Sequence, residues 1–247
     1  MQHFLKALYQ YSQTVSEACL PSHCLLCNLP SKQSLICSFC YHSILTERSC
    51  CLHCGCGLTS SQAHCGECLR HPFNFHQLHA IANYQSPFPE LIKQLKYNNQ
   101  LLYADLLGLL LAESVKQRYP SAELEEIDYL IPIPLHNKKH RSRGFNQTQL
   151  IANTLIKQIP LTIAKQKITR NKLTKPQEGL TRVERTHNLK EAFSLSTQAK
   201  EDLQGKYIVL LDDVVTTGAT INSLCQTLIA ANVKRIDVWC ICRTELQ

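Results

Sequence analysis

The sequence lacks any run of about 18 apolar residues, the length that a membrane-spanning helix requires. Its first twenty residues, MQHFLKALYQYSQTVSEACL, also lack the continuous apolar core of a secretory signal. The chain has 247 residues, which suits one large domain or a medium domain with a small one. We therefore expect a globular, cytoplasmic protein without a membrane span.

Acidic residues are scarce in two basic segments. Residues 138–143 carry four cations and no acid, and residues 165–190 carry eight cations against two acids. The net charge of +7 is concentrated in these segments, and the rest of the chain is acidic on balance. Such a local excess favours an anionic ligand such as a phosphate or a nucleic acid. The alternative is a solvated basic face.

Aromatic residues are also scarce in the basic segments, where only Phe145 and Phe193 occur within 138–147 and 165–193. Proteins that bind single strands usually interleave aromatic side chains with cations, so that bases can stack. The basic segments therefore favour a small ligand. DNA binding stays open in the cysteine-rich region, where four aromatics lie near Arg70.

Cysteine, by contrast, is abundant. Eleven of the fourteen cysteines lie between Cys19 and Cys68, and eight of these form four C-x-x-C pairs: Cys24/Cys27, Cys37/Cys40, Cys51/Cys54 and Cys65/Cys68. Two such pairs complete a tetrahedral zinc site with four thiolate ligands. We therefore predict a segment at 1–20, then a module of two sequential zinc ribbons over 21–72.

The alternative reading of these cysteines is a disulfide framework, which needs an oxidising compartment. Two further points stay open. One is which cysteine pairs share a zinc ion, and the other is whether a neighbouring side chain replaces a ligand, the candidates being Cys50, Cys56, His53 and His64. About fifty residues bury too small a core to fold alone, so the metal would supply folding energy. Four thiolates leave no open coordination position, which indicates a structural role.

Helix and strand patterns alternate over 76–247. A strand followed by a helix is expected within 79–97. Further strands are expected at 127–135, 161–165, 206–212 and 235–242, and further helices at 100–118, 145–158 and 221–232. This alternation predicts an α/β fold with a mostly parallel sheet flanked by helices. In such sheets, ligands bind beyond the carboxyl ends of the strands.

One stretch stands at such an end: YIVLLDDVVTTGATI, residues 207–221. Because strand side chains alternate, Asp212 and Asp213 cannot both point the same way, and at least one should face the cleft. The following TTGAT turn has backbone N–H groups at a helix N-terminus, which suit a phosphate. A carboxylate pair beside a phosphate site fits a sugar phosphate. The plain alternative is a strand, a turn and a helix cap with two surface acids.

The stretch IVLLDDVVTTGAT resembles the 5-phosphoribosyl-1-pyrophosphate motif of type I phosphoribosyltransferases. Together with IPIPLHNKKHRSRGFNQ (131–147), QEGLTRVERTHNLKEAF (177–193) and the paired cysteines, it makes the chain resemble the ComF family, from about Cys24 to Arg243. The resemblance implies a cytoplasmic protein with a type I phosphoribosyltransferase-like domain behind a double zinc ribbon. It also implies a role in natural competence, in the handling of incoming single-stranded DNA.

By position, the resemblance implies that Asp212 and Asp213 bind the ribose hydroxyls, directly or through Mg²⁺. The residues that would wrap the 5′-phosphate are Thr216, Thr217, Gly218, Ala219 and Thr220. The candidates for the pyrophosphate are Arg143 and Gly144, assisted by Lys139 and Arg141. The stretch around 170–190 matches the mobile hood loop of the superfamily, which would bring Arg182 or Arg185 over the leaving group.

The implied reaction displaces pyrophosphate from C1 of the ribose, with Mg²⁺ and protein cations stabilising the departing group. Thr216 stands where purine-salvage enzymes of the superfamily carry an aspartate that acts toward the base, which disfavours a 6-oxopurine acceptor. The alternative function is an inactive DNA-binding adaptor, in which the zinc module and basic loops link DNA to a helicase. The sequence indicates neither the acceptor nor the oligomeric state.

Overall fold

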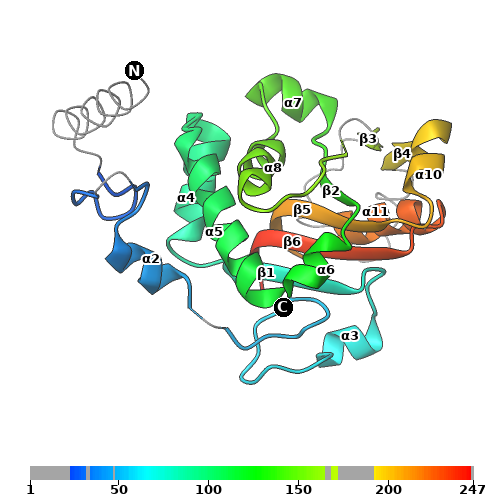
Figure 1. The fold of residues 1–247 in the computed structure, drawn as a ribbon, viewed down its shortest axis with the longest axis horizontal. Helices are drawn as coiled ribbons and strands as arrows, with labels where there is room; N and C mark the ends of the chain where they lie inside the picture. The colour runs from blue at the N-terminus through cyan, green and yellow to red at the C-terminus, as the bar shows by residue number, and fades with distance from the viewer. Residues whose placement is uncertain (1–22, 32–33, 47, 165–167, 172–191, 246–247) are drawn as a thin grey trace, which may run out of the picture. The chain divides into compact units, whose positions relative to one another are not determined.

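The structure is a computed structural model of the chain, and it describes residues 23–31, 34–46, 48–164, 168–171 and 192–245 (Figure 1). By their contacts the residues divide into two compact units, 1–46 and 47–247. The expected segment 1–20 lies outside the described residues. Among the described residues, no helix combines the length and the apolar character that crossing a membrane needs.

Over its described residues, 23–31 and 34–46, the smaller unit contains a short turn and one helix. The turn is closed by a bridge between His23 and Pro30. The helix is α2, Ser38–Ile44, and the thiol of Cys37 caps it by accepting from the N–H of Cys40 at 3.5 Å. The turn and the helix start each carry one C-x-x-C pair.

The larger unit is built on a four-stranded parallel sheet with the order β1-β6-β5-β2 (Figure 1). The strands are β1 (Gln77–Asn83), β2 (Tyr129–Pro132), β5 (Tyr207–Val215) and β6 (Arg235–Arg243). The two central strands, β5 and β6, are apolar on both faces, as expected where helices cover a sheet on both sides.

Helices cover both faces of the sheet. On one face α5 (Leu102–Arg118) and α8 (Gln147–Gln158) pack together and against the strands, and α4 (Phe88–Asn98) packs on α5. On the other face the apolar side of α11 (Ala219–Ile229) shares a core with Leu210 and Val238. The remaining elements are α3 (Gly66–Arg70), α6 (Ser121–Glu125), α7 (Asn137–Arg143), α10 (Thr197–Leu203) and the antiparallel pair β3 (Ile168–Arg170) and β4 (Phe193–Leu195).

The predicted α/β class is confirmed, and the differences are local. Strand β5 continues to Val215 and pairs with β6 up to Arg243, so both aspartates lie inside the strand, whereas the predicted strand ended at Asp212. The β-branched Val214 and Val215 favour this extension. Residues 161–164 contribute only a bridge from Ile163 to Leu130. The basic segment 138–143 forms most of α7, a helix that the sequence reading did not include.

The second cysteine segment belongs to the larger unit, whereas the sequence suggested a separate module over 21–72 and a domain from 76. Arg48 accounts for part of this attachment. Its guanidinium donates to the carbonyls of Gly55 and Ala80 at 2.6 and 3.1 Å, and to Asn83 Oδ1 at 2.7 Å. These bonds join the start of the cysteine segment to β1, a long-range contact that no local pattern reveals.

His79 in β1 makes the stability of the larger unit sensitive to acid. Its Nε2 lies 2.9 Å from Ser114 Oγ, and burial, helped by Arg118 and Arg48, lowers the pKa of His79 to about 4. In the unfolded chain the pKa is about 6.5. Between these values the unfolded chain binds a proton that the folded chain excludes. The contribution of neutral His79 is therefore complete above pH 6.5 and is lost as the pH falls toward 4.

We expect this titration to lower the free energy of unfolding by roughly 2 to 3 kcal/mol between pH 7 and pH 4. A His79→Gln variant keeps a hydrogen-bonding side chain but should lose this part of the decrease. The measurement is urea unfolding at several pH values, followed by the fluorescence of Trp239, the single tryptophan of the chain. Equal pH dependence in both proteins would contradict the prediction.

Candidate functional site

Two adjacent carboxylates project from β5 near its carboxyl end, on opposite faces of the sheet. Leu210 lies in the core shared with α11, so alternation places Asp212 on that face and Asp213 on the face of α4. Asp213 Oδ2 lies 2.6 Å from Lys96 Nζ, which comes from α4. Each carboxylate also accepts the N–H of the next residue, at 2.9 Å for Asp212 and 2.8 Å for Asp213.

The electrostatics of the pair favour a bound cation. Burial, together with the adjacent charge of Asp213, raises the pKa of Asp212 to about 7, against the opposing effect of Lys96 and Arg170. Burial disfavours the charge on Lys96, but Asp213 and Asp212 outweigh it and raise the pKa of the ammonium group. Carboxylate oxygens are hard ligands of the kind that Mg²⁺ prefers. The pair is therefore suited to a divalent cation or to hydroxyl donors.

The loop after β5 turns sharply into α11. Gly218 is the N-cap, with φ of +74°, a left-handed conformation that favours glycine. A Cβ added there would lie 2.7 Å from Cε1 of Phe73. The first N–H groups of a helix have no partner within it and lie at the positive end of its dipole. The loop residues Thr216, Thr217, Gly218, Ala219 and Thr220 thus form a turn of the kind that suits an anion, at the same sheet edge as the aspartates, and we refer to it as the anion-binding turn.

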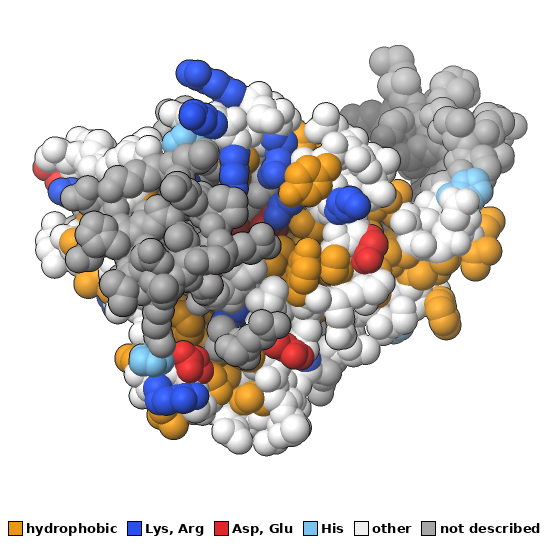
Figure 2. Space-filling model, turned by 180° about the vertical axis from the view of Figure 1, so that it is seen from behind, with side chains coloured by type: hydrophobic (Ala, Val, Ile, Leu, Met, Phe, Trp, Pro, Cys, Tyr) orange, Lys and Arg blue, Asp and Glu red, His pale blue; other side chains and the backbone are white. Residues whose placement is uncertain are grey.

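Several cations converge on the acidic pair. The pKa of Lys139 is lowered by desolvation beside the site and by Arg170, Arg143 and Lys96, while Asp213 opposes this shift. Arg143, in the last turn of α7, hydrogen-bonds Gln147 Oε1. The guanidinium of Arg143 also lies 5.7 Å from the centre of the Tyr97 ring. Lysine and arginine side chains gather beside a recessed acidic patch in Figure 2.

The other predicted residues differ in their placement. Arg141 and Gly144 are exposed, and Gly144 ends α7 with φ of +83°. Arg182 and Arg185, the hood-loop candidates, lie outside the described residues.

Two cations of the site, Lys96 and Arg170, were not singled out from the sequence. Lys96 follows Ile92 by four residues, so the helical period places it beside the buried face of α4. A lysine at such a position is a signal that could have found it. Burial lowers the pKa of Arg170, and Asp212 opposes the shift. Arg170 was counted in the basic segment, but nothing local distinguishes it from its neighbours.

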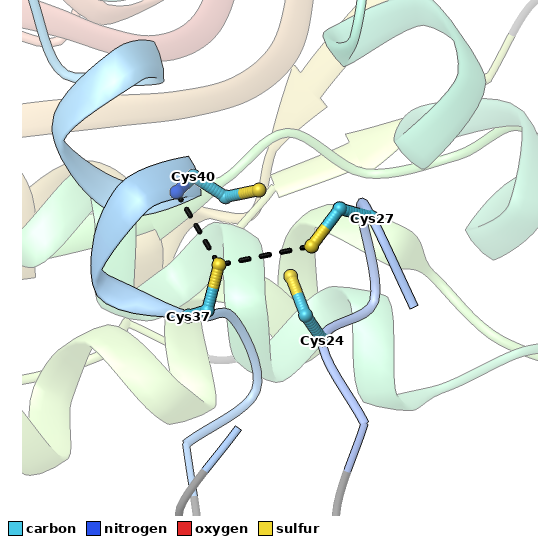
Figure 3. A group of neighbouring side chains, drawn as sticks. All are labelled: Cys24, Cys27, Cys37 and Cys40. Carbon is cyan, nitrogen blue, oxygen red and sulfur yellow. Dashed lines mark hydrogen bonds between the residues drawn. The ribbon is translucent and has the colours of Figure 1, made fainter. Parts of the chain in front are cut away.

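The first two C-x-x-C pairs form a compact group in the smaller unit. Their side chains point toward one another, Cys24 and Cys27 from the turn and Cys37 and Cys40 from the start of α2 (Figure 3). All four sulfur atoms lie within 4.8 Å of one another, and those of Cys27 and Cys37 are 3.7 Å apart. A tetrahedral zinc with sulfur ligands at about 2.3 Å requires sulfur separations of about 3.8 Å. The group therefore fits a zinc ion.

The second group, in the larger unit, has the same geometry. Its four thiols also lie within 4.8 Å of one another, with separations of 3.8 Å between Cys51 and Cys68 and 3.7 Å between Cys54 and Cys65. The described cysteines are free thiols, so the structure does not contain the alternative disulfide framework there. The possible replacement ligands stay outside both groups. His53, for example, places its Nδ1 3.0 Å from the carbonyl oxygen of His76.

Comparison with known proteins agrees with this architecture. The phosphoribosyl transferase domain model matches residues 142–245. The DNA utilization protein YhgH of Escherichia coli K12 is 34% identical over 227 residues, which cover 91% of this chain and 98% of that protein. Competence protein F of Haemophilus influenzae Rd is 32% identical over 222 residues, covering 89% and 96%.

Among solved structures, the hypoxanthine-guanine phosphoribosyl transferase of L. donovani covers 57% of this chain and 71% of its own, at 12% identity and a TM-score of 0.37. That similarity is too low to assign a family, whereas the two sequence relatives match almost over their whole length. The chain therefore belongs to the ComF family of competence-linked proteins, in which an N-terminal region of paired cysteines precedes a phosphoribosyl transferase domain.

Proposed function

We propose that this protein binds 5-phosphoribosyl-1-pyrophosphate with Mg²⁺ and transfers its ribose phosphate to an acceptor. The observation that carries the proposal is the meeting of a carboxylate pair and an anion-binding turn at one sheet edge. Asp212 and Asp213 precede the turn by only a few residues, and Gly218 opens α11. A ligand with vicinal hydroxyls on one side and a phosphate on the other matches this arrangement.

Each part of the donor has a group suited to it. In this proposal, Asp212 and Asp213 accept hydrogen bonds from the ribose hydroxyls, or they bind an Mg²⁺ ion that the hydroxyls also bind. The backbone N–H groups around Gly218 donate hydrogen bonds to the 5′-phosphate in this proposal. Lys139 lies close enough to Asp213 for the two charges to act on each other, and Arg143 acts in the same way on Lys139 and Lys96. We propose that Lys139 and Arg143 hold the pyrophosphate. When bound, Mg²⁺ would neutralise charge on the departing pyrophosphate.

In the reaction, the bond between C1 of the ribose and the pyrophosphate oxygen breaks, and a bond from C1 to the acceptor forms. The electron pair of the broken bond leaves with pyrophosphate, which the cations stabilise. Arg182 and Arg185, in the segment expected to close over the donor, are proposed to add to this stabilisation. Thr216 offers no general base near neutral pH, so the acceptor must lose its proton to another group.

We further propose that each cysteine group binds one zinc ion in a structural role. The sulfur separations fit tetrahedral coordination, and four thiolates leave no position for a substrate. Burial raises the pKa of Cys54 to about 12, so a cation is needed to keep this thiolate at neutral pH.

The names of the relatives suggest that the reaction serves the use of DNA taken up in competence. The exposed cations of α7, Lys138, Lys139 and Arg141, would suit the backbone of a single strand. A DNA-binding adaptor without catalytic activity would use the same cations. Binding of 5-phosphoribosyl-1-pyrophosphate distinguishes the transferase from such an adaptor.

Calorimetric titration of the full chain tests the proposal. We expect 5-phosphoribosyl-1-pyrophosphate to bind with a Kd of about 1 µM to 1 mM when Mg²⁺ is present. Binding should weaken when Mg²⁺ is replaced by a chelator, because the acidic pair then faces the donor without a cation. Ribose 5-phosphate serves as the control that lacks the pyrophosphate. Absence of donor binding in the presence of Mg²⁺ would overturn the proposed function.

A further inference from the structure

Arg243, the last residue of β6, is a buried charge whose role the site described above does not explain. It is 1% exposed, and it pairs in register with Val215 on one side and with Asn83 on the other. Its guanidinium donates to backbone carbonyls from three separate parts of the chain. Nε–H donates to Cys54 at 2.9 Å, and Nη1–H donates to Val215 at 3.0 Å, to Thr216 and to Thr244 at 3.1 Å.

These bonds join the second cysteine group to the anion-binding turn. Cys54 is one of the four grouped thiols, and Val215 and Thr216 are the residues at which β5 ends and the turn begins. A guanidinium group is planar and carries its donors in a fixed fork, so it holds several carbonyls at a defined spacing. The side chain of Arg243 therefore fixes the distance between the second cysteine group and the anion-binding turn.

A second contact joins the same two parts through packing. The ring of Phe73 packs against the second cysteine group, and it also lies against Gly218, the N-cap of α11. Phe73 is held in turn by a stacked neighbour, Phe75, with ring centres 5.1 Å apart.

A third contact reaches the first turn of α11. The backbone N–H of Asn74 donates to Asn222 Oδ1 at 2.9 Å. Three independent contacts, made by Arg243, Phe73 and Asn74, thus connect residues 54–74 with residues 215–222.

We infer that the second cysteine group is a positioning element for the phosphate turn, and that Arg243 is the positioning residue that links them. When zinc is bound, the second cysteine group holds the turn in its anion-binding geometry. Binding of zinc to this group and binding of the anion to the turn therefore favour each other. Such coupling is reciprocal by thermodynamic necessity. The inference deepens the proposed function, on which its ligand-dependent part rests.

The first test is hydrogen exchange on the full chain without any ligand, so it does not depend on the donor. Arg243→Lys keeps the charge but loses the fork, and Phe73→Leu removes the ring from Gly218 while keeping an apolar side chain. In both variants we expect exchange over 215–222 to accelerate by about tenfold, with unchanged exchange in β2 and unchanged zinc content. Arg235→Lys, at the opposite end of β6, is the matched control and should leave 215–222 unchanged.

Two exchange results would overturn the inference. One is unchanged exchange at 215–222 in both variants. The other is acceleration spread equally over β2, because a merely structural arginine would loosen the whole unit.

The second test measures zinc release to a chromogenic chelator from a Cys24→Ser chain, in which the second group is the intact one. Mg²⁺ with 5-phosphoribosyl-1-pyrophosphate should slow this release by about fivefold or more, and Arg243→Lys should abolish the slowing. Unchanged release in the presence of bound donor would overturn the coupling. If the donor does not bind at all, the proposed function fails and the exchange result alone decides the role of Arg243.

Discussion

Replacement of Asp212 and Asp213 by asparagine is expected to weaken the Mg²⁺-dependent binding of 5-phosphoribosyl-1-pyrophosphate by about 100-fold or more. Each carboxylate would contribute a hydrogen bond to a charged group, which is worth about 1.5 to 3 kcal/mol, and about 1.4 kcal/mol corresponds to tenfold in affinity. Asparagine keeps the shape but loses the charge that attracts a divalent cation. Calorimetry of the double variant beside the wild type measures the effect.

The same substitution removes the ion-pair partner of Lys96, whose ammonium lies 2.6 Å from Asp213 Oδ2, so the folding of the variant must be checked separately. Asp128 provides the matched control. Its carboxylate accepts from the Tyr207 N–H at 2.9 Å and pairs with Lys206 at 3.0 Å, at the opposite end of β5. Asp128→Asn should lower stability and leave donor affinity unchanged. If the double variant bound the donor as tightly as the wild type, the acidic pair would not be the ribose site.

Loss of metal from the two cysteine groups is expected to have different consequences for the larger unit. Metal analysis of the wild type should find about two zinc ions per chain, as the two groups imply. Cys54→Ser should lower the unfolding temperature of the larger unit by more than about 10 °C, because structural zinc contributes several kcal/mol to the fold that holds it. Trp239, which is completely buried in β6, reports this transition by fluorescence.

Cys24→Ser serves as the comparison, because Cys24 belongs to the smaller unit and Trp239 to the larger one. This variant should lose one zinc ion and leave the tryptophan transition within a few degrees of the wild type. A wild-type metal content near one would mean that one group does not bind zinc. Equal destabilisation by the two variants would mean that the units do not unfold separately.

The sequence predicted those features whose cause is local. The apolar runs and their alternation with helices identify a parallel sheet, and the four C-x-x-C pairs identify the eight cysteines that the structure gathers into two groups. The turn at Gly218 also has a local signature, since a small residue must follow the strand where the chain reverses into a helix. The class of fold follows from these patterns.

The features that escaped prediction depend on residues far apart in the chain. Lys96 meets Asp213 across more than a hundred residues, and Arg243 meets Cys54 across almost two hundred. A single sequence shows the charge of such a residue but not the distant partner that compensates for the burial of that charge. The division of the cysteine segment has the same origin, because Arg48 attaches it to β1 through Ala80 and Asn83.

The ion pair between Lys96 and Asp213 has a consequence for selectivity among metal ions. The free protein already supplies a positive charge to its acidic pair, from an ammonium group that cannot diffuse away. An incoming cation must compete with this tethered ammonium, and a monovalent ion at cellular concentration brings no more charge than the lysine already provides. A divalent ion brings twice the charge, and when it arrives with a polyphosphate it also offers Lys96 new anionic oxygens. We therefore expect Lys96 to disfavour sodium and potassium at the acidic pair and to favour a divalent metal that binds together with a phosphate ligand.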